Sequence, residues 1–102
     1  MKVKKIINAC MAGVLLLFGS AVHAGDIIAG KASSASCAGC HGAQGISSNP
    51  LWPNLAGQQV GYLVKQLTAF RDGGRTDPMM TPMAKTLTDA DIQNLAAWYN
   101  SL

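Results

Sequence analysis

The sequence has few charged residues, and this shortage excludes some classes of partner. Only 13% of its 102 residues are charged, and the formal net charge of +3 comes from lysines near the start. Residues 25–102 contain five basic and five acidic side chains, so their formal charge is zero. Because that part has no basic surplus, it offers no general electrostatic attraction for nucleic acid or an anionic membrane.

Cysteines are also too few for a disulfide framework. After residue 24 the chain keeps only Cys37 and Cys40. A disulfide between residues so close in sequence closes a very small loop and restricts the unfolded chain little. A domain of this size buries too little surface to be comfortably stable by itself. We therefore expect the two cysteines to hold some other stabilising group.

A long hydrophobic run is missing as well. Positive charge in residues 2–5 precedes an apolar core at 9–18, which is short for a membrane span of about 20 residues. Val22 and Ala24 then place small or short side chains at the two positions that a signal peptidase reads. We predict that residues 1–24 are a secretory signal peptide, removed after Ala24.

The remaining residues, 25–102, are predicted to form one all-helical domain. A helix is weakly indicated over 26–36 and clearly over 59–71, where apolar residues recur at three- and four-residue steps before Gly73. The last helix is expected to begin after an N-cap at Thr88. No segment has the alternating pattern of a strand, and no internal repeat is present.

Two long loops are predicted between these helices. Residues 42–58 are rich in glycine, proline and asparagine, which is typical of loops. Residues 75–86 are expected to form a second loop, held extended near Pro78 and Pro82. Helices with such loops form only a small core, and they are better suited to surround a flat apolar cofactor.

Cys37-Ala38-Gly39-Cys40-His41 is the C-x-x-C-H pattern of covalent haem attachment. On a helical turn, residues three and four apart share a face, so both thiols and the imidazole project together. The thiols can then form thioethers with the two haem vinyl groups, while the imidazole binds iron. A single pattern predicts one haem c.

Other uses of the cysteine pair fit the sequence less well. A thioredoxin-like redox pair needs a strand before it and a helix after it, whereas a loop follows here. A zinc site needs further cysteines or histidines, and residues 42–102 contain none. The same lack excludes a second histidine on the iron. The remaining soft donors are Met79, Met80 and Met83, of which at least one is expected to bind iron; a lysine or an N-terminal amine is a less usual alternative.

In the order of its motifs the chain resembles class I cytochromes c, and in particular one half of the two-haem cytochromes of the c4 type. The motifs are CAGCHG at 37–42, PNLAGQ at 53–58, YLVKQLTAFRDGGRT at 62–76, MTPMAKTL at 80–87 and IQNLAAWYNSL at 92–102. The resemblance implies an all-α fold of three to four helices and long loops wrapped around one covalently bound haem. The second haem-binding half of the c4 type is missing.

The resemblance also implies roles for single residues around the haem. The ligating methionine of the family lies seven residues before the leucine that precedes the last helix, which selects Met80. The carbonyl of Pro53 would accept a hydrogen bond from the ring of His41, and Leu55 would pack against the haem.

Two further pairs of residues have implied positions. Gly30 and Trp98 would lie where the first and last helices cross. Arg71 and Arg75 are candidates to pair with the haem propionates, or else are solvated charges near a helix end.

The function implied is that of a periplasmic one-electron carrier with a low-spin, His/Met-ligated haem c, and not that of an enzyme. Its partners would be redox proteins such as a membrane reductase or terminal oxidase, met transiently by a monomer or weak dimer. Two alternatives stay open. One is a haem enzyme or ligand sensor with five-coordinate iron, and the other is a fixed electron-entry subunit of a larger oxidoreductase.

Overall fold

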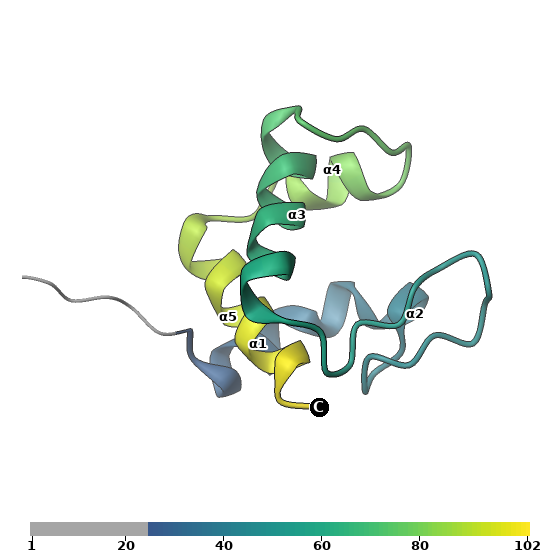
Figure 1. The fold of residues 1–102 in the computed structure, drawn as a ribbon, viewed down its shortest axis with the longest axis vertical. Helices are drawn as coiled ribbons and strands as arrows, with labels where there is room; N and C mark the ends of the chain where they lie inside the picture. The colour runs from purple at the N-terminus through teal and green to yellow at the C-terminus, as the bar shows by residue number, and fades with distance from the viewer. Residues whose placement is uncertain (1–24) are drawn as a thin grey trace, which may run out of the picture.

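Five α-helices and one 3-10 turn make up the regular structure of residues 25–102, the part that the computed structural model describes (Figure 1). They are α1 (Ile27–Ser33), the 3-10 turn (Ser34–Ser36), α2 (Ala38–His41), α3 (Val60–Asp72), α4 (Met80–Ala84) and α5 (Asp89–Asn100). This part contains no strand, which confirms the all-α prediction. None of its helices combines the length and apolar character needed to cross a membrane. The predicted signal peptide, residues 1–24, lies outside the described residues.

Helices α1 and α5 cross in close contact, and α3 packs against α5 beside them (Figure 1). The crossing depends on Gly30, because a Cβ there would overlap the Asn94 carbonyl and lie 2.9 Å from the Cβ of Trp98. The Lys31 ammonium lies 5.6 Å from the centre of the Trp98 ring and covers this contact. The expected positions of Gly30 and Trp98 are confirmed.

Helix α5 begins at the predicted cap and supplies most of the core. The Thr88 hydroxyl accepts a hydrogen bond from the Asp91 amide, and the Asp91 carboxylate accepts one from the Thr88 amide. This reciprocal capping box satisfies two amides that have no partner within the helix. The core cluster comprises Leu63, Leu95, Ala96, Trp98 and Tyr99.

Helix α3 agrees with its prediction to within one residue at each end. Gly73 adopts a φ of 95° and its amide bonds to the Ala69 carbonyl at 3.1 Å, so the helix ends as expected. Leu63 and Phe70 are buried, whereas Val60, expected on the same apolar face, is exposed. Leu63, Leu67 and Phe70 on this face line the cavity described below, whereas Val60 at the start of the helix does not.

The prediction of an extended loop over residues 75–86 was wrong in its second half, where α4 forms. Pro82 is the third residue of α4, and a proline in the first turn removes an amide that would have no helical partner anyway. The Thr81 amide bonds to the Asp77 carbonyl at 3.0 Å, which starts the turn before the proline is reached. Ala84 is fully buried and fixes the end of α4 to the rest of the domain.

Candidate functional site

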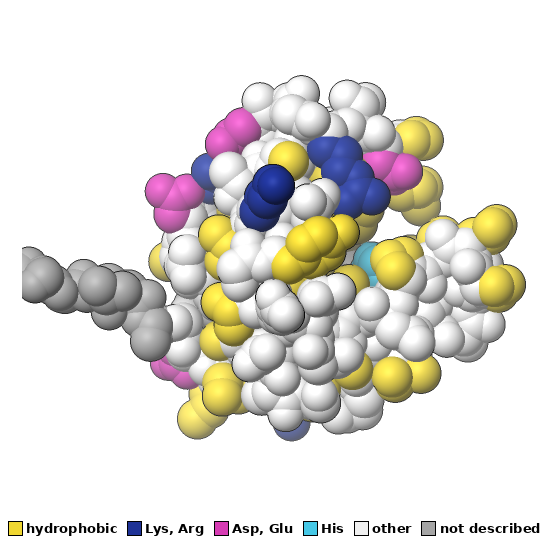
Figure 2. Space-filling model, in the orientation of Figure 1, with side chains coloured by type: hydrophobic (Ala, Val, Ile, Leu, Met, Phe, Trp, Pro, Cys, Tyr) yellow, Lys and Arg dark blue, Asp and Glu magenta, His cyan; other side chains and the backbone are white. Residues whose placement is uncertain are grey.

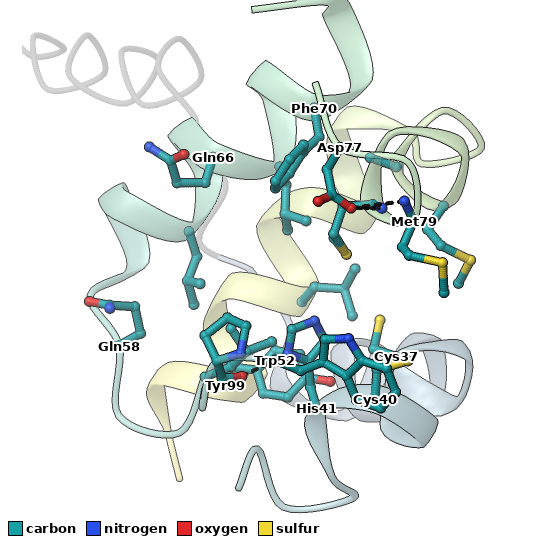
Figure 3. Close-up of a pocket in the computed structure, with 18 of the residues that line it drawn as sticks. Cys37, Cys40, His41, Trp52, Gln58, Gln66, Phe70, Asp77, Met79 and Tyr99 are labelled. Carbon is teal, nitrogen blue, oxygen red and sulfur yellow. Dashed lines mark hydrogen bonds between the residues drawn. The ribbon is translucent and has the colours of Figure 1, made fainter. Parts of the chain in front are cut away.

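A cavity of about 530 Å³ opens between the cysteine motif, helix α3 and the methionine segment around α4. Hydrophobic side chains gather around the histidine at its mouth (Figure 2). In Figure 3, Cys37, Cys40 and His41 lie on one side of this space, and Asp77 and Met79 lie on another. Apolar residues in the lining include Leu55, Leu63, Leu67, Phe70, Ala84, Leu87 and Leu95.

The turn of α2 brings both cysteines and the histidine to the cavity. The His41 amide bonds to the Cys37 carbonyl at 2.9 Å, which places the two residues on one helical face. Gly42 ends this turn with a φ of 85°, and a Cβ there would overlap the Ile46 carbonyl. Because the cysteines and His41 all line the cavity, they can meet one flat ligand from one side.

The imidazole of His41 is buried and held by one hydrogen bond. Its Nδ1 lies 2.8 Å from the carbonyl oxygen of Pro53. A carbonyl oxygen can only accept, so Nδ1 carries a hydrogen, and in the neutral ring Nε2 keeps its lone pair. His41 is therefore fixed in the tautomer that binds a metal through Nε2.

The loop over residues 42–58 is pinned at several points, and this holds Pro53 in place. The Gly45 carbonyl accepts a hydrogen bond from the Leu55 amide at 2.8 Å, which closes the loop on itself. The Gly57 amide donates to the Tyr99 carbonyl at 2.8 Å, which ties the end of the loop to α5. Leu55, predicted to pack against the cofactor, lines the cavity and also touches the core cluster.

Cys37 and Cys40 are not joined by a disulfide, and both occupy partly buried positions. Burial raises the pKa of the Cys37 thiol, although the neighbouring polar side chains of Ser36 and Tyr99 act in the opposite direction. Tyr99 is buried, and its hydroxyl lies beside the Cys37 sulfur and the Ser34 side chain. Partial burial disfavours a charged thiolate at Cys37 and is compatible with an uncharged sulfur, such as that of a thioether.

All three candidate methionines line the cavity, but they differ in exposure. Met79 is 57% exposed and Met83 is 43% exposed, whereas Met80 is partly buried. Met80 also has its backbone amide bonded to the Asp77 carboxylate at 2.8 Å. Of the three, Met80 is thus the side chain most sheltered by the protein.

The two candidate arginines have different surroundings. Arg71 forms ion pairs with Asp72 at 2.9 Å and Asp89 at 2.8 Å, and it is not part of the cavity lining. Arg75 does line the cavity, and it donates to the Gln66 side-chain oxygen at 2.6 Å. Its guanidinium lies 4.5 Å from the centre of the Phe70 ring. Only Arg75 therefore brings positive charge to the cavity.

These features fit a haem bound through C-x-x-C-H. The cavity has mostly apolar walls, two cysteine sulfurs beside a correctly oriented imidazole, and soft thioether donors on another wall. Gln66 lies well away from the cysteines in Figure 3, so a flat ligand attached at Cys37 and Cys40 can direct a polar edge toward Gln66 and Arg75. The residues present match the donors and the lining that such a cofactor needs.

The hydrogen-bonded unit of Asp77 and Thr81 that leads into α4 was not predicted from the sequence. A signal for it was present, because Asp followed by Pro favours the start of a turn. The partnership of Arg75 with Gln66 and Phe70 had no comparable signal, since it depends on how the chain after Gly73 folds back onto α3.

Comparisons with known proteins agree with this site. The model of the cytochrome c family matches residues 27–102. Cytochrome c-554(548) of Halomonas halodenitrificans is 44% identical over 81 residues, which cover 76% of this chain and 98% of that protein. Cytochrome c4 of Pseudomonas aeruginosa is 43% identical over 97 residues, which cover 92% of this chain and 48% of that protein.

A solved structure, reduced recombinant cytochrome c4 from Pseudomonas stutzeri, superposes with a TM-score of 0.73 at 40% sequence identity. The match covers 76% of this chain and 46% of that one, so the chain spans about half the length of the c4 proteins. With the motif, the cavity and these matches in agreement, the chain belongs to the cytochrome c family, has its all-α class I fold, and takes covalent haem c as its cofactor.

Proposed function

We propose that this chain is a one-electron carrier whose haem c is attached through Cys37 and Cys40 and has His41 and Met80 as axial ligands. The main support is that one cavity is lined by an imidazole with a free Nε2 lone pair and by a sheltered methionine on a different segment. When bound, haem c supplies an iron that accepts and releases single electrons.

The protein's own groups would make this site a carrier rather than an enzyme. The Pro53 carbonyl holds the His41 ring and raises the basicity of its Nε2. A thioether ligand from Met80 favours the reduced state and raises the reduction potential. If His41 and Met80 both bind the iron, they would leave no coordination position open for oxygen or peroxide. The apolar lining would keep water away from the haem and favour its less charged, reduced state. Like the Met80 thioether, it would therefore raise the reduction potential.

Arg75 is the proposed partner of a haem propionate, and Arg71 is not. A carboxylate and a guanidinium form short, strong hydrogen bonds, and Arg75 is the arginine that lines the cavity. Gln66 and the Phe70 ring already hold its guanidinium in place. Arg71 is occupied by Asp72 and Asp89.

We further propose that residues 1–24 direct export to the periplasm and are removed there, leaving a freely diffusing carrier. Exposed apolar side chains at the cavity rim, among them Leu51, Met79 and Met83, would provide a small contact area for transient redox partners. Because residues 25–102 have no net formal charge, electron transfer to such partners should depend only weakly on salt.

Visible spectra of the purified holoprotein, with carbon monoxide added to the reduced form, test the proposal. A closed carrier gives a low-spin spectrum that carbon monoxide leaves unchanged, and a far-red iron–sulfur band when oxidised. A high-spin spectrum that shifts with carbon monoxide would instead support a haem enzyme or a ligand sensor.

The Met80→Ala variant identifies the ligand, with Met83→Ala as its matched control. We expect Met80→Ala to lose the iron–sulfur band and to bind carbon monoxide, while Met83→Ala behaves as the parent protein. Identical spectra for the two variants would show that the ligand has been assigned to the wrong methionine.

A further inference from the structure

We propose that Asp77 and Thr81 are positioning residues that fix the segment containing Met80, and so keep its sulfur at the iron. This inference rests on the proposed function, because it requires Met80 to be the ligand. It concerns hydrogen bonds that lie in the protein itself and that the haem motif does not predict.

The Asp77 carboxylate holds the start of the segment. Its Oδ2 accepts hydrogen bonds from the backbone amides of Met79 and Met80, both at 2.8 Å. Hydrogen bonds to an ionised carboxylate are about twice as strong as those between neutral groups. The backbone of Met80 is therefore bound directly to a side chain three residues earlier.

Thr81 holds the same segment from the other end. Its Oγ1 accepts a hydrogen bond from the Asp77 amide at 2.8 Å, and its own amide donates to the Asp77 carbonyl at 3.0 Å. Four hydrogen bonds thus link Asp77 to the three residues Met79, Met80 and Thr81. Met80 lies inside this closed unit.

Apart from the packing of α4 against α3 around the buried Ala84, few contacts would keep Met80 in one position. Helix α4 has five residues, and an isolated helix shorter than about 12 residues is only marginally stable in water. Met79 and Met83 on either side are exposed, and Ala84 is the one residue of α4 that is buried. Without the Asp77–Thr81 unit, the backbone of this segment would be free to move the Met80 sulfur away from the iron.

The chain contains a matched control at the start of α5. Thr88 and Asp91 form the same kind of reciprocal pair, with hydrogen bonds of 2.9 and 3.0 Å. Neither residue lines the cavity. Loss of this pair should weaken the fold without acting on Met80.

The test uses holoproteins at one neutral pH and measures the rate at which carbon monoxide binds the reduced iron, together with the far-red iron–sulfur band of the oxidised form. We expect Asp77→Ala to accelerate carbon monoxide binding about tenfold or more, because Met80 leaves the iron more often. Thr81→Val, which keeps the side-chain shape, should act in the same direction. Asp77→Asn retains an acceptor oxygen but not its charge, so its binding rate should lie between those of Asp77→Ala and the parent protein.

Thr88→Ala should lower the unfolding midpoint and leave the binding rate unchanged. An equal acceleration in Thr88→Ala would mean that general destabilisation, not positioning, causes the effect. If Met80→Ala loses the band but Asp77→Ala and Thr81→Val bind carbon monoxide as slowly as the parent, the positioning role is refuted while the proposed ligation stands. If Met80→Ala keeps the band, the ligand itself is wrong, and the inference falls with it.

Discussion

The crossing of α1 over α5 gives a prediction whose size follows from the structure. A Cβ added at Gly30 meets the Asn94 carbonyl and the Cβ of Trp98 at once, and neither belongs to the flexible end of a side chain. The two helices must therefore move apart. Overpacking of this kind costs about 1–3 kcal/mol or more, and the helix propensity gained from alanine returns at most about 1 kcal/mol.

Gly30→Ala should therefore destabilise the holoprotein by roughly 2 kcal/mol, which is about 8–16 °C in the thermal midpoint of a domain this size. Gly61→Ala in α3 is the matched control, because a Cβ there meets nothing within 4 Å. That variant should gain stability, by up to about 1 kcal/mol.

Thermal unfolding followed by circular dichroism measures both variants under the same conditions. The packing argument predicts opposite signs for the two glycines. If Gly30→Ala unfolds at the parent temperature or above it, the helices are not in contact as described, and the explanation of Gly30 is wrong.

Two further predictions concern charge. Arg75→Gln should lower the reduction potential by the equivalent of roughly 1 kcal/mol, because the reduced haem would lose the attraction of a nearby positive charge. Arg71→Gln should leave the reduction potential unchanged in the same spectroelectrochemical titration. Burial raises the pKa of Tyr99 in the folded protein. Above about pH 10 the hydroxyl of Tyr99 therefore ionises in the unfolded chain but not yet in the folded one. The free energy of unfolding should then fall by up to about 1.4 kcal/mol per pH unit. In Tyr99→Phe this decrease in the free energy of unfolding should be absent when guanidinium unfolding is measured from pH 9 to 12. The same slope against pH in both proteins would contradict the prediction.

The features that could be predicted from the sequence depend on local signals. The capping pair at Thr88, the glycine end of α3 and the turn that joins Cys37 to His41 are each determined by residues within a few positions of one another. Such signals act through backbone geometry and short-range hydrogen bonds, which vary little with the surroundings. The cysteine motif was recognisable for the same reason.

What could not be predicted depends on residues distant in sequence or on competing local signals. The extended conformation expected near Pro82 came from a general rule about prolines, but the hydrogen bonds of Asp77 start a helical turn that tolerates it. The different roles of Arg71 and Arg75 were also unresolved, because their partners Asp89 and Gln66 are placed by tertiary folding.

The distribution of buried side chains implies that folding and haem attachment depend on each other. Among residues 25–102, only Ile92 and Leu95 are large side chains with almost no exposure, and much of the apolar face of α3 lines the cavity. A small domain with so limited a core needs a cofactor to complete it. Cys40→Ser removes one of the two attachment points, so we expect it to lose stable haem.

Far-ultraviolet circular dichroism of Cys40→Ser should then show a chain that is largely unfolded, with haem retention read from the visible spectrum of the same sample. Met83→Ala, produced in parallel, should keep both its haem and its helices and so controls for expression. A Cys40→Ser protein that lacks haem yet unfolds cooperatively from a fully helical state would show that the core of α3 and α5 is sufficient. The stability of the domain would then come from the packing of α1 and α3 against α5, and Gly30→Ala would destabilise the domain more than Cys40→Ser.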